Sequence, residues 1–108
     1  KFDWDWEGMK KMAEKGLQIN PNNSYGYILL SNYHLVKGDL GNAINVALVA
    51  EKLDPLNPRT GCLVAETYFM DKQFEKSINQ YNKVLELFPG YGFAWDGMGA
   101  RQISTIDG

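Results

Sequence analysis

The sequence predicts an all-α fold in which antiparallel helices stack into a superhelix, the architecture called an α-solenoid. Three prolines, Pro21, Pro55 and Pro89, are each separated by 34 residues, and the segments between them repeat one order of apolar stretches and turns. Within these stretches apolar residues recur at intervals of three and four, which is the spacing of one helix face. An alternation with period two, typical of strands, is missing from them. A repeat of this length indicates stacked units that share a continuous core.

About six helices are expected from these stretches, each antiparallel to the next. They cover Trp6–Gln18, Ser24–Lys37, Leu40–Leu53, Pro58–Asp71, Phe74–Phe88 and Tyr91–Thr105. Asn57-Pro58 is typical of a helix N-cap followed by proline in the first turn, and Asn23-Ser24 offers capping groups at the equivalent place. We interpret residues 1–108 as one domain with a second helix of a partial repeat at 1–23 and a first helix of another at 92–108. Two full units, the first repeat (24–57) and the second repeat (58–91), lie between them.

The 34-residue unit resembles the tetratricopeptide repeat (TPR), whose pattern is W-x2-L-G-x2-Y, then A-x3-F, then P. The matching positions are Tyr27, Leu30, Ser31, His34, Ala43, Ala47 and Pro55, then Gly61, Val64, Ala65, Tyr68, Ser77, Tyr81 and Pro89, then Trp95, Met98, Gly99 and Gln102. Small residues in this pattern, such as Ser31 and Ala65, are expected where paired helices approach closely. Gly61 stands where a large aromatic residue is usual, so the second repeat is expected to be less completely filled.

The charge balance argues against nucleic acid as a ligand. Eleven Lys and Arg face thirteen Asp and Glu, for a net charge of -2, and the basic residues are scattered along the chain. Binding DNA or RNA requires a concentrated positive face. No run of about eighteen apolar residues occurs, so no membrane-spanning segment is predicted.

The lone cysteine, Cys62, excludes an intrachain disulfide and fits a reducing compartment, so a cytoplasmic location is expected. Because the chain opens at Lys1 with sequence that is already typical of structure, we expect it to be a piece of a longer protein.

The residue inventory does not predict an enzyme. It contains one histidine and no glycine-rich loop after a strand, so neither a nucleophile–base pair nor a phosphate cradle is indicated. No cofactor and no metal are expected. His34 shares a helix face with Tyr27 and Leu30 and is interpreted as a packing residue, and Cys62 as a groove or packing residue with an unreactive thiol.

The resemblance to TPR arrays implies a binding surface, because in that family the first helices line a concave face where ligands usually bind. The candidate groove residues on these helices are Tyr25, Asn32, Arg59, Glu66, Phe93 and Asp96. Ile28, Leu35 and Phe69 share the stripe but are expected to pack between repeats. Arg59 beside Glu66 favours a ligand of mixed charge. The family's mode of gripping acidic chaperone tails is not expected, because Ile28, Phe93 and Gly97 stand where that mode uses Lys and Arg.

Three functions remain open from the sequence. The leading one is a protein-interaction scaffold that holds a peptide or protein partner. The second is a sensory or self-association module of a larger bacterial transcriptional regulator or nucleotide cyclase, because the opening residues 2–8 are similar to a phrase in TPR regions of such proteins. A homo-oligomer would then form through apolar residues of the end helices, namely Trp6, Met9, Met12, Trp95, Met98 and Ile103. The third is a structural spacer.

Overall fold

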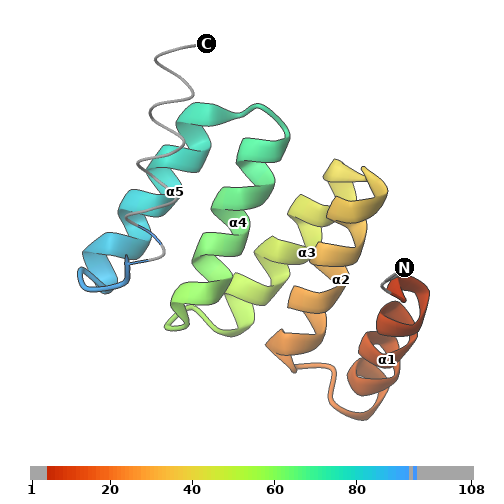
Figure 1. Ribbon diagram of the computed structural model, residues 1–108. Helices are drawn as coiled ribbons and strands as arrows, with labels where there is room; N and C mark the ends of the chain where they lie inside the picture. Colours follow the sequence, from red (N-terminus) through yellow and green to blue (C-terminus); the bar gives the residue numbers. More distant parts are fainter. Residues whose placement is uncertain (1–4, 93, 95–108) are drawn as a thin grey trace.

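The computed structural model describes residues 5–92 and 94, and within these residues the chain forms five helices and no strand. The helices are α1 (Trp6–Ile19), α2 (Ser24–Lys37), α3 (Leu40–Leu53), α4 (Pro58–Met70) and α5 (Phe74–Leu87) (Figure 1). The all-α superhelical prediction is confirmed, and the ends expected for α1, α4 and α5 are each wrong by one residue. Of the sixth expected helix, Gly92 and Ala94 are helical and the expected first residue, Tyr91, is not, while Phe93 and residues 95–105 lie outside the described residues.

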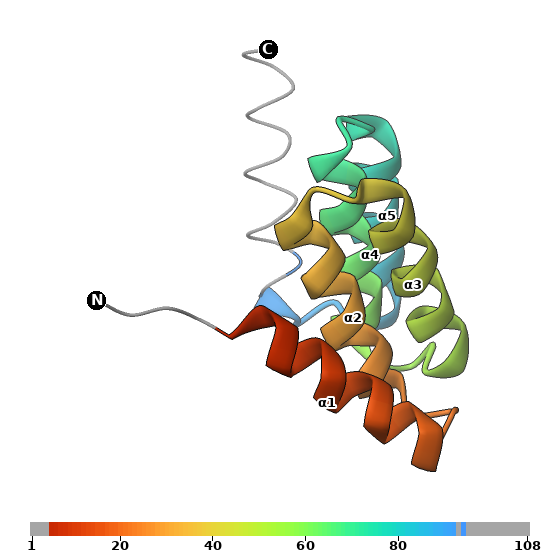
Figure 2. The same ribbon diagram turned by 90° about the vertical axis from the view of Figure 1, so that its right-hand side faces the viewer.

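The five helices lie in chain order, each beside the one before it (Figure 1). The most extensive contacts join α2 to α3 and α4 to α5, which are the helix pairs of the first and second repeats. Contacts of α3 with α4 stack one pair on the other, and α2 also touches α4. Seen from the side, α1 runs at an angle across the end of the stack (Figure 2). This order brings the two first helices, α2 and α4, next to one another.

Asparagine caps fix the starts of both first helices. The Asn23 side chain accepts a hydrogen bond from the Tyr25 backbone N–H at 3.1 Å, and Asn57 accepts one from Arg59 N–H at 3.0 Å. Such a cap satisfies a backbone donor that lacks an intrahelical partner. Pro58 follows Asn57 in the first turn, as the sequence predicted.

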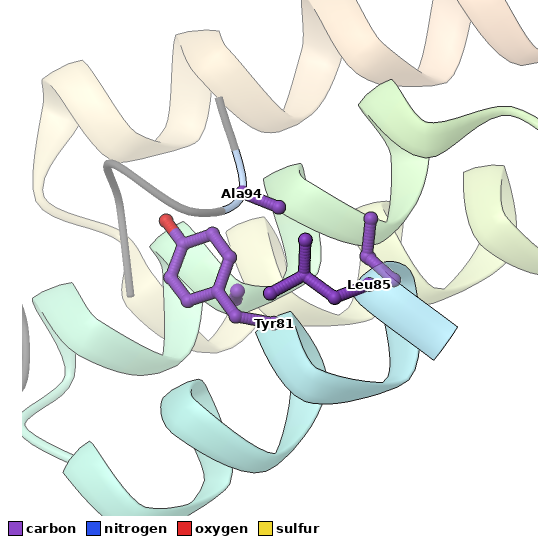
Figure 3. Packing of buried hydrophobic residues seen from close by; sticks show 5 residues of the cluster. Tyr81, Leu85 and Ala94 are labelled. Carbon is purple, nitrogen blue, oxygen red and sulfur yellow. The ribbon is translucent and has the colours of Figure 1, made fainter. Parts of the chain in front are cut away.

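The core consists of two apolar clusters. One joins α2, α3 and α4 through Ile28, Ala47, Ala50, Leu63 and Val64, and the other contains Ala65, Tyr81, Val84, Leu85 and Ala94. In Figure 3 the side chains of Tyr81 and Leu85, both from α5, lie beside Ala94. Tyr81 is 1% exposed, and burying a large apolar side chain of this kind contributes about 1.5–3 kcal/mol. The second cluster therefore extends past α5 to Ala94.

The space directly beside the Gly61 Cα is occupied by α5, whereas a hollow that Gly61 also lines stays open, so the expectation of a less completely filled second repeat holds only in part. A Cβ built on Gly61 would lie 2.5 Å from Val84 Cγ2, which means that α5 occupies the place that an aromatic residue would take. A hollow of about 120 Å³ remains beside it, near Pro55 and Phe88. The side chain that occupies the space beside Gly61 thus comes from α5 and not from α4.

The N-terminal helix, α1, is held on α2 by small apolar contacts and one polar cluster. Ala13 is the buried residue of α1, and Leu17 lies over Gly26. The Tyr33 hydroxyl donates to Glu7 at 2.8 Å, and Lys37 Nζ lies 3.1 Å from the same carboxylate. The Tyr33 hydrogen bond, and next that of Lys37, hold the pKa of Glu7 below its usual range. Neither apolar cluster includes a residue of α1.

Candidate functional site

A hollow of about 420 Å³ lies where α2 and α4 run side by side. Its lining residues come from both first helices and from the segment after α5, and they are Ile28, Asn32, Arg59, Cys62, Leu63, Glu66 and Tyr91. Ile28 and Leu63 are 5% and 8% exposed and form its buried part. The hollow therefore combines an apolar floor with polar side chains around it.

The starts of the two first helices are tied together through Asp54, which ends α3. Ser24 Oγ donates to Asp54 Oδ2 at 3.2 Å, and Asn57 Nδ2 donates to the same oxygen at 3.1 Å. The Thr60 hydroxyl lies 3.0 Å from the Asp54 carbonyl oxygen. Since Ser24 opens α2 while Asn57 caps α4, these bonds set the spacing of the two helices that border the hollow.

Three of the predicted groove residues, Asn32, Arg59 and Glu66, are brought together in this hollow. Tyr25 is not among its lining residues: it is 53% exposed at the start of α2. Phe93 and Asp96 lie outside the described residues.

Ile28, expected to pack, is buried and also forms part of the floor. Leu63 and Tyr91 were not predicted as groove residues. Tyr91 stands one repeat after Asn57, at the position where both full repeats have a capping asparagine. This replacement of asparagine by tyrosine was the feature of the sequence that could have indicated its place in the hollow.

The thiol in the hollow is protonated near neutral pH. Burial, and next the negative charge of Glu66, raise the pKa of Cys62 to about 11. A reactive cysteine needs a lowered pKa, because the thiolate is the nucleophile. Cys62 is therefore a neutral, half-buried part of the floor.

His34 lies outside the hollow, with Nδ1 3.9 Å from Asp39 Oδ2. Its ring meets that of Tyr33 edge-on, with the centroids 5.5 Å apart. Across residues 5–92 and 94, no three His, Cys, Asp or Glu side chains form a group that could hold a metal ion. In the same part of the chain, no helix has the length and apolar character needed to cross a bilayer.

A second depression, of about 470 Å³, lies over the start of α5. Its lining is one short segment, residues 72–76. A depression made by a single turn cannot hold a ligand between two elements, so the hollow between α2 and α4 is the stronger candidate.

No model of a protein family matches the sequence, and no curated protein matches it. Solved structures do match. An O-GlcNAc transferase mutant from Thermobaculum terrenum is 28% identical with a TM-score of 0.79, over 85% of this chain and 18% of that one. MamA is 21% identical with a TM-score of 0.77, over 94% of this chain and 59% of that one. The Arabidopsis OM64 TPR domain is 13% identical with a TM-score of 0.80, over 92% and 82%.

The chain has a TPR-like fold. It spans only 18% and 59% of the transferase and of MamA, so nothing about the activity of those whole proteins carries over. The low identities to MamA and to the OM64 domain establish the fold alone. In TPR terms, α2 and α4 are first helices, and the hollow lies between them.

Proposed function

We propose that this TPR-like domain is a non-enzymatic protein-interaction scaffold that holds a peptide or protein segment between α2 and α4. The observation that supports this most is the composition of the hollow: an apolar floor of Ile28 and Leu63, with Asn32, Arg59 and Glu66 around it. Ligand sites commonly combine an apolar lining with a few polar groups that fix orientation. A chain with one cysteine, which allows no intrachain disulfide, suits a reducing compartment, and a cytoplasmic location is part of this proposal.

The test is selection of peptides from a random display library on the intact domain. Selected peptides are then measured on a groove variant, Asn32→Ala with Arg59→Ala and Glu66→Ala. The matched outer-surface variant carries Asn82→Ala with Lys52→Ala and Glu86→Ala, which removes one amide, one cation and one anion from exposed positions of α3 and α5. Affinity should fall at least tenfold in the groove variant only. Full affinity in the groove variant, or loss in the outer-surface variant, would place binding elsewhere.

A second candidate is self-association through α1, as expected of a sensory or regulatory module. Met12 and Ile19 are 74% and 79% exposed. In the repeat register, Gly16 on α1 corresponds to Ala50 and Val84, which are buried in α3 and α5. A further helix could therefore cover the face of α1 that carries Gly16.

Sedimentation equilibrium tests this candidate. Self-association should weaken in Met12→Lys and persist in Met70→Lys, which adds the same charge at another exposed methionine. A monomer at all concentrations would exclude it.

A further inference from the structure

The charges around the hollow have a defined spacing. Arg59 and Glu66 lie seven residues apart on α4, which is almost two helical turns, so both project from one face. Seven residues of helix rise about 10.5 Å. An extended chain advances about 3.3 Å per residue and places every second side chain on one face, so side chains at positions i, i+2 and i+4 face the hollow together. The outer two are about 13 Å apart along the chain, close enough for long charged side chains to reach both Arg59 and Glu66.

The floor between these charges is apolar and uncharged. Ile28 and Leu63 are buried, and the Cys62 thiol, whose pKa burial raises to about 11, carries no charge at neutral pH. Burying an apolar side chain there is favourable, whereas a charged one would lose its hydration without a partner.

The remaining polar group comes from the opposite helix. Asn32, on α2, carries both hydrogen-bond donors and an acceptor, which suits the N–H and C=O groups of an extended backbone. Arg59 is exposed, and no ion pair or side-chain hydrogen bond engages its guanidinium among the described residues. Guanidinium matches the geometry of a carboxylate.

We propose that the hollow selects an extended segment in which an acidic and a basic side chain stand four residues apart with an apolar side chain midway between them. The acidic group lies on Arg59, the basic group near Glu66, and the apolar side chain on the floor of Ile28, Cys62 and Leu63. This inference rests on the proposed function, since it specifies the partner of the same site. A segment with two acidic groups would bring one of them against Glu66, and a segment with two basic groups would bring one against Arg59.

A display library with four charge patterns tests this selectivity. Two positions four residues apart, with an apolar residue midway between them, are acidic–basic, basic–acidic, acidic–acidic or basic–basic, and all other positions are shared. Relative to a like-charged pattern, a mixed pattern gains one exposed ion pair and avoids one like-charge contact of similar size, so the preferred mixed pattern should be enriched about two- to thirtyfold over both like-charged patterns. The two mixed orders differ in the direction of the segment, and enrichment of either one supports the inference.

Single charge reversals should then switch the preference. Arg59→Glu should select basic–basic segments, and Glu66→Arg should select acidic–acidic ones. Arg59→Glu should still fold, because an acidic residue is favourable in the first turn of a helix. The matched control, Lys52→Glu with Glu86→Arg on the outer surface, should leave the preference unchanged.

Protection of the single cysteine from alkylation separates the two possible failures. Any segment seated between α2 and α4 should slow alkylation of Cys62, whatever its charges. If library peptides protect Cys62 but show no charge preference, in the unaltered domain and in the charge-reversal variants alike, that result would overturn this inference and leave the proposed function standing. If no pattern protects Cys62, binding between α2 and α4 fails and the inference fails with it.

Discussion

In the first repeat the buried hydroxyl that bonds from one helix of the pair to the other belongs to Ser31 on α2, whereas in the second repeat it belongs to Ser77 on α5. Ser31 Oγ donates to the Ala43 carbonyl oxygen at 2.9 Å, and Ser77 Oγ donates to the Ala65 carbonyl oxygen at 2.8 Å. Ser31 corresponds to Ala65 in the 34-residue register, and Ala43 corresponds to Ser77. All four are fully buried. Each crossing therefore contains one hydroxyl and one methyl group, contributed by opposite helices.

Side-chain size is exchanged in the same way at the other end of each pair. In the first repeat the large Tyr27 packs against a cluster that contains the small Ala50. In the second repeat Gly61 and Val84 stand at these positions, and Val84 occupies the space next to Gly61. The fold constrains the combined side-chain volume and the hydrogen bonding of two facing residues, and either residue of the pair can supply them.

The largest expected effect comes from placing the aromatic residue of the first repeat into the second. Gly61→Tyr puts a ring where Val84 Cγ2 already lies, 2.5 Å from the first added carbon. Overpacking of this kind costs about 1–3 kcal/mol in the free energy of unfolding. Chemical denaturation measures it. Gly41→Tyr is the control, because open space surrounds a Cβ at Gly41, and that variant should keep its stability.

The pairwise account of Gly61 and Val84 is tested by the double variant. Gly61→Tyr with Val84→Ala reproduces the Tyr27–Ala50 combination, so the two changes should couple favourably by about 1 kcal/mol or more. Additive losses in the double-mutant cycle would mean that the two positions do not share one space.

A smaller effect is expected from the buried hydroxyl of the second repeat. Ser77→Ala removes the hydrogen bond to the Ala65 carbonyl oxygen and should lower the free energy of unfolding by about 1 kcal/mol. Adding Ala65→Ser moves the hydroxyl to α4, as in the first repeat, and should recover most of that loss. If the double variant is no more stable than Ser77→Ala alone, the two crossings are not equivalent.

The helices were predictable from the sequence because their signals are local. Asn57 with Pro58 marks the start of α4, and the spacing of apolar residues sets its face. The grouping of Asn32, Arg59 and Glu66 was predictable for a related reason, since first helices of neighbouring units stack in register.

Features that depend on facing pairs were not predictable. The filling of the space beside Gly61 comes from Val84, which lies in another helix. Tyr25 corresponds to Arg59 in the repeat register, yet only Arg59 lines the hollow. Arg59 has α2 beside it, whereas the described residues contain no first helix before α2 that could complete the same hollow at Tyr25. Periodicity identifies the stripe, and a neighbouring helix on the correct side makes it part of a groove.

The smallest expected effect concerns the starts of the second helices. Asp39 caps α3 by accepting from the Asn42 backbone N–H at 3.4 Å, whereas its counterpart Gln73 makes no capping bond to α5. Gln73→Asp should raise the free energy of unfolding by about 0.5–1 kcal/mol at neutral pH.

That gain should depend on pH. The Asn42 side chain, and next its backbone N–H, lower the pKa of Asp39, and a capping bond should likewise lower the pKa of the new carboxylate at position 73 in the folded state. A carboxylate with a lowered folded pKa contributes stability above its unfolded pKa of about 3.9, and the contribution is lost as the pH falls through the folded value. Gln73→Asn is the matched control, because its amide can cap without titrating. Denaturation at about pH 7 and about pH 3 should therefore show a gain that disappears in acid for Gln73→Asp and persists for Gln73→Asn. An equal gain for both variants at both pH values would contradict a charged cap, and no gain for either would show that the start of α5 does not limit stability.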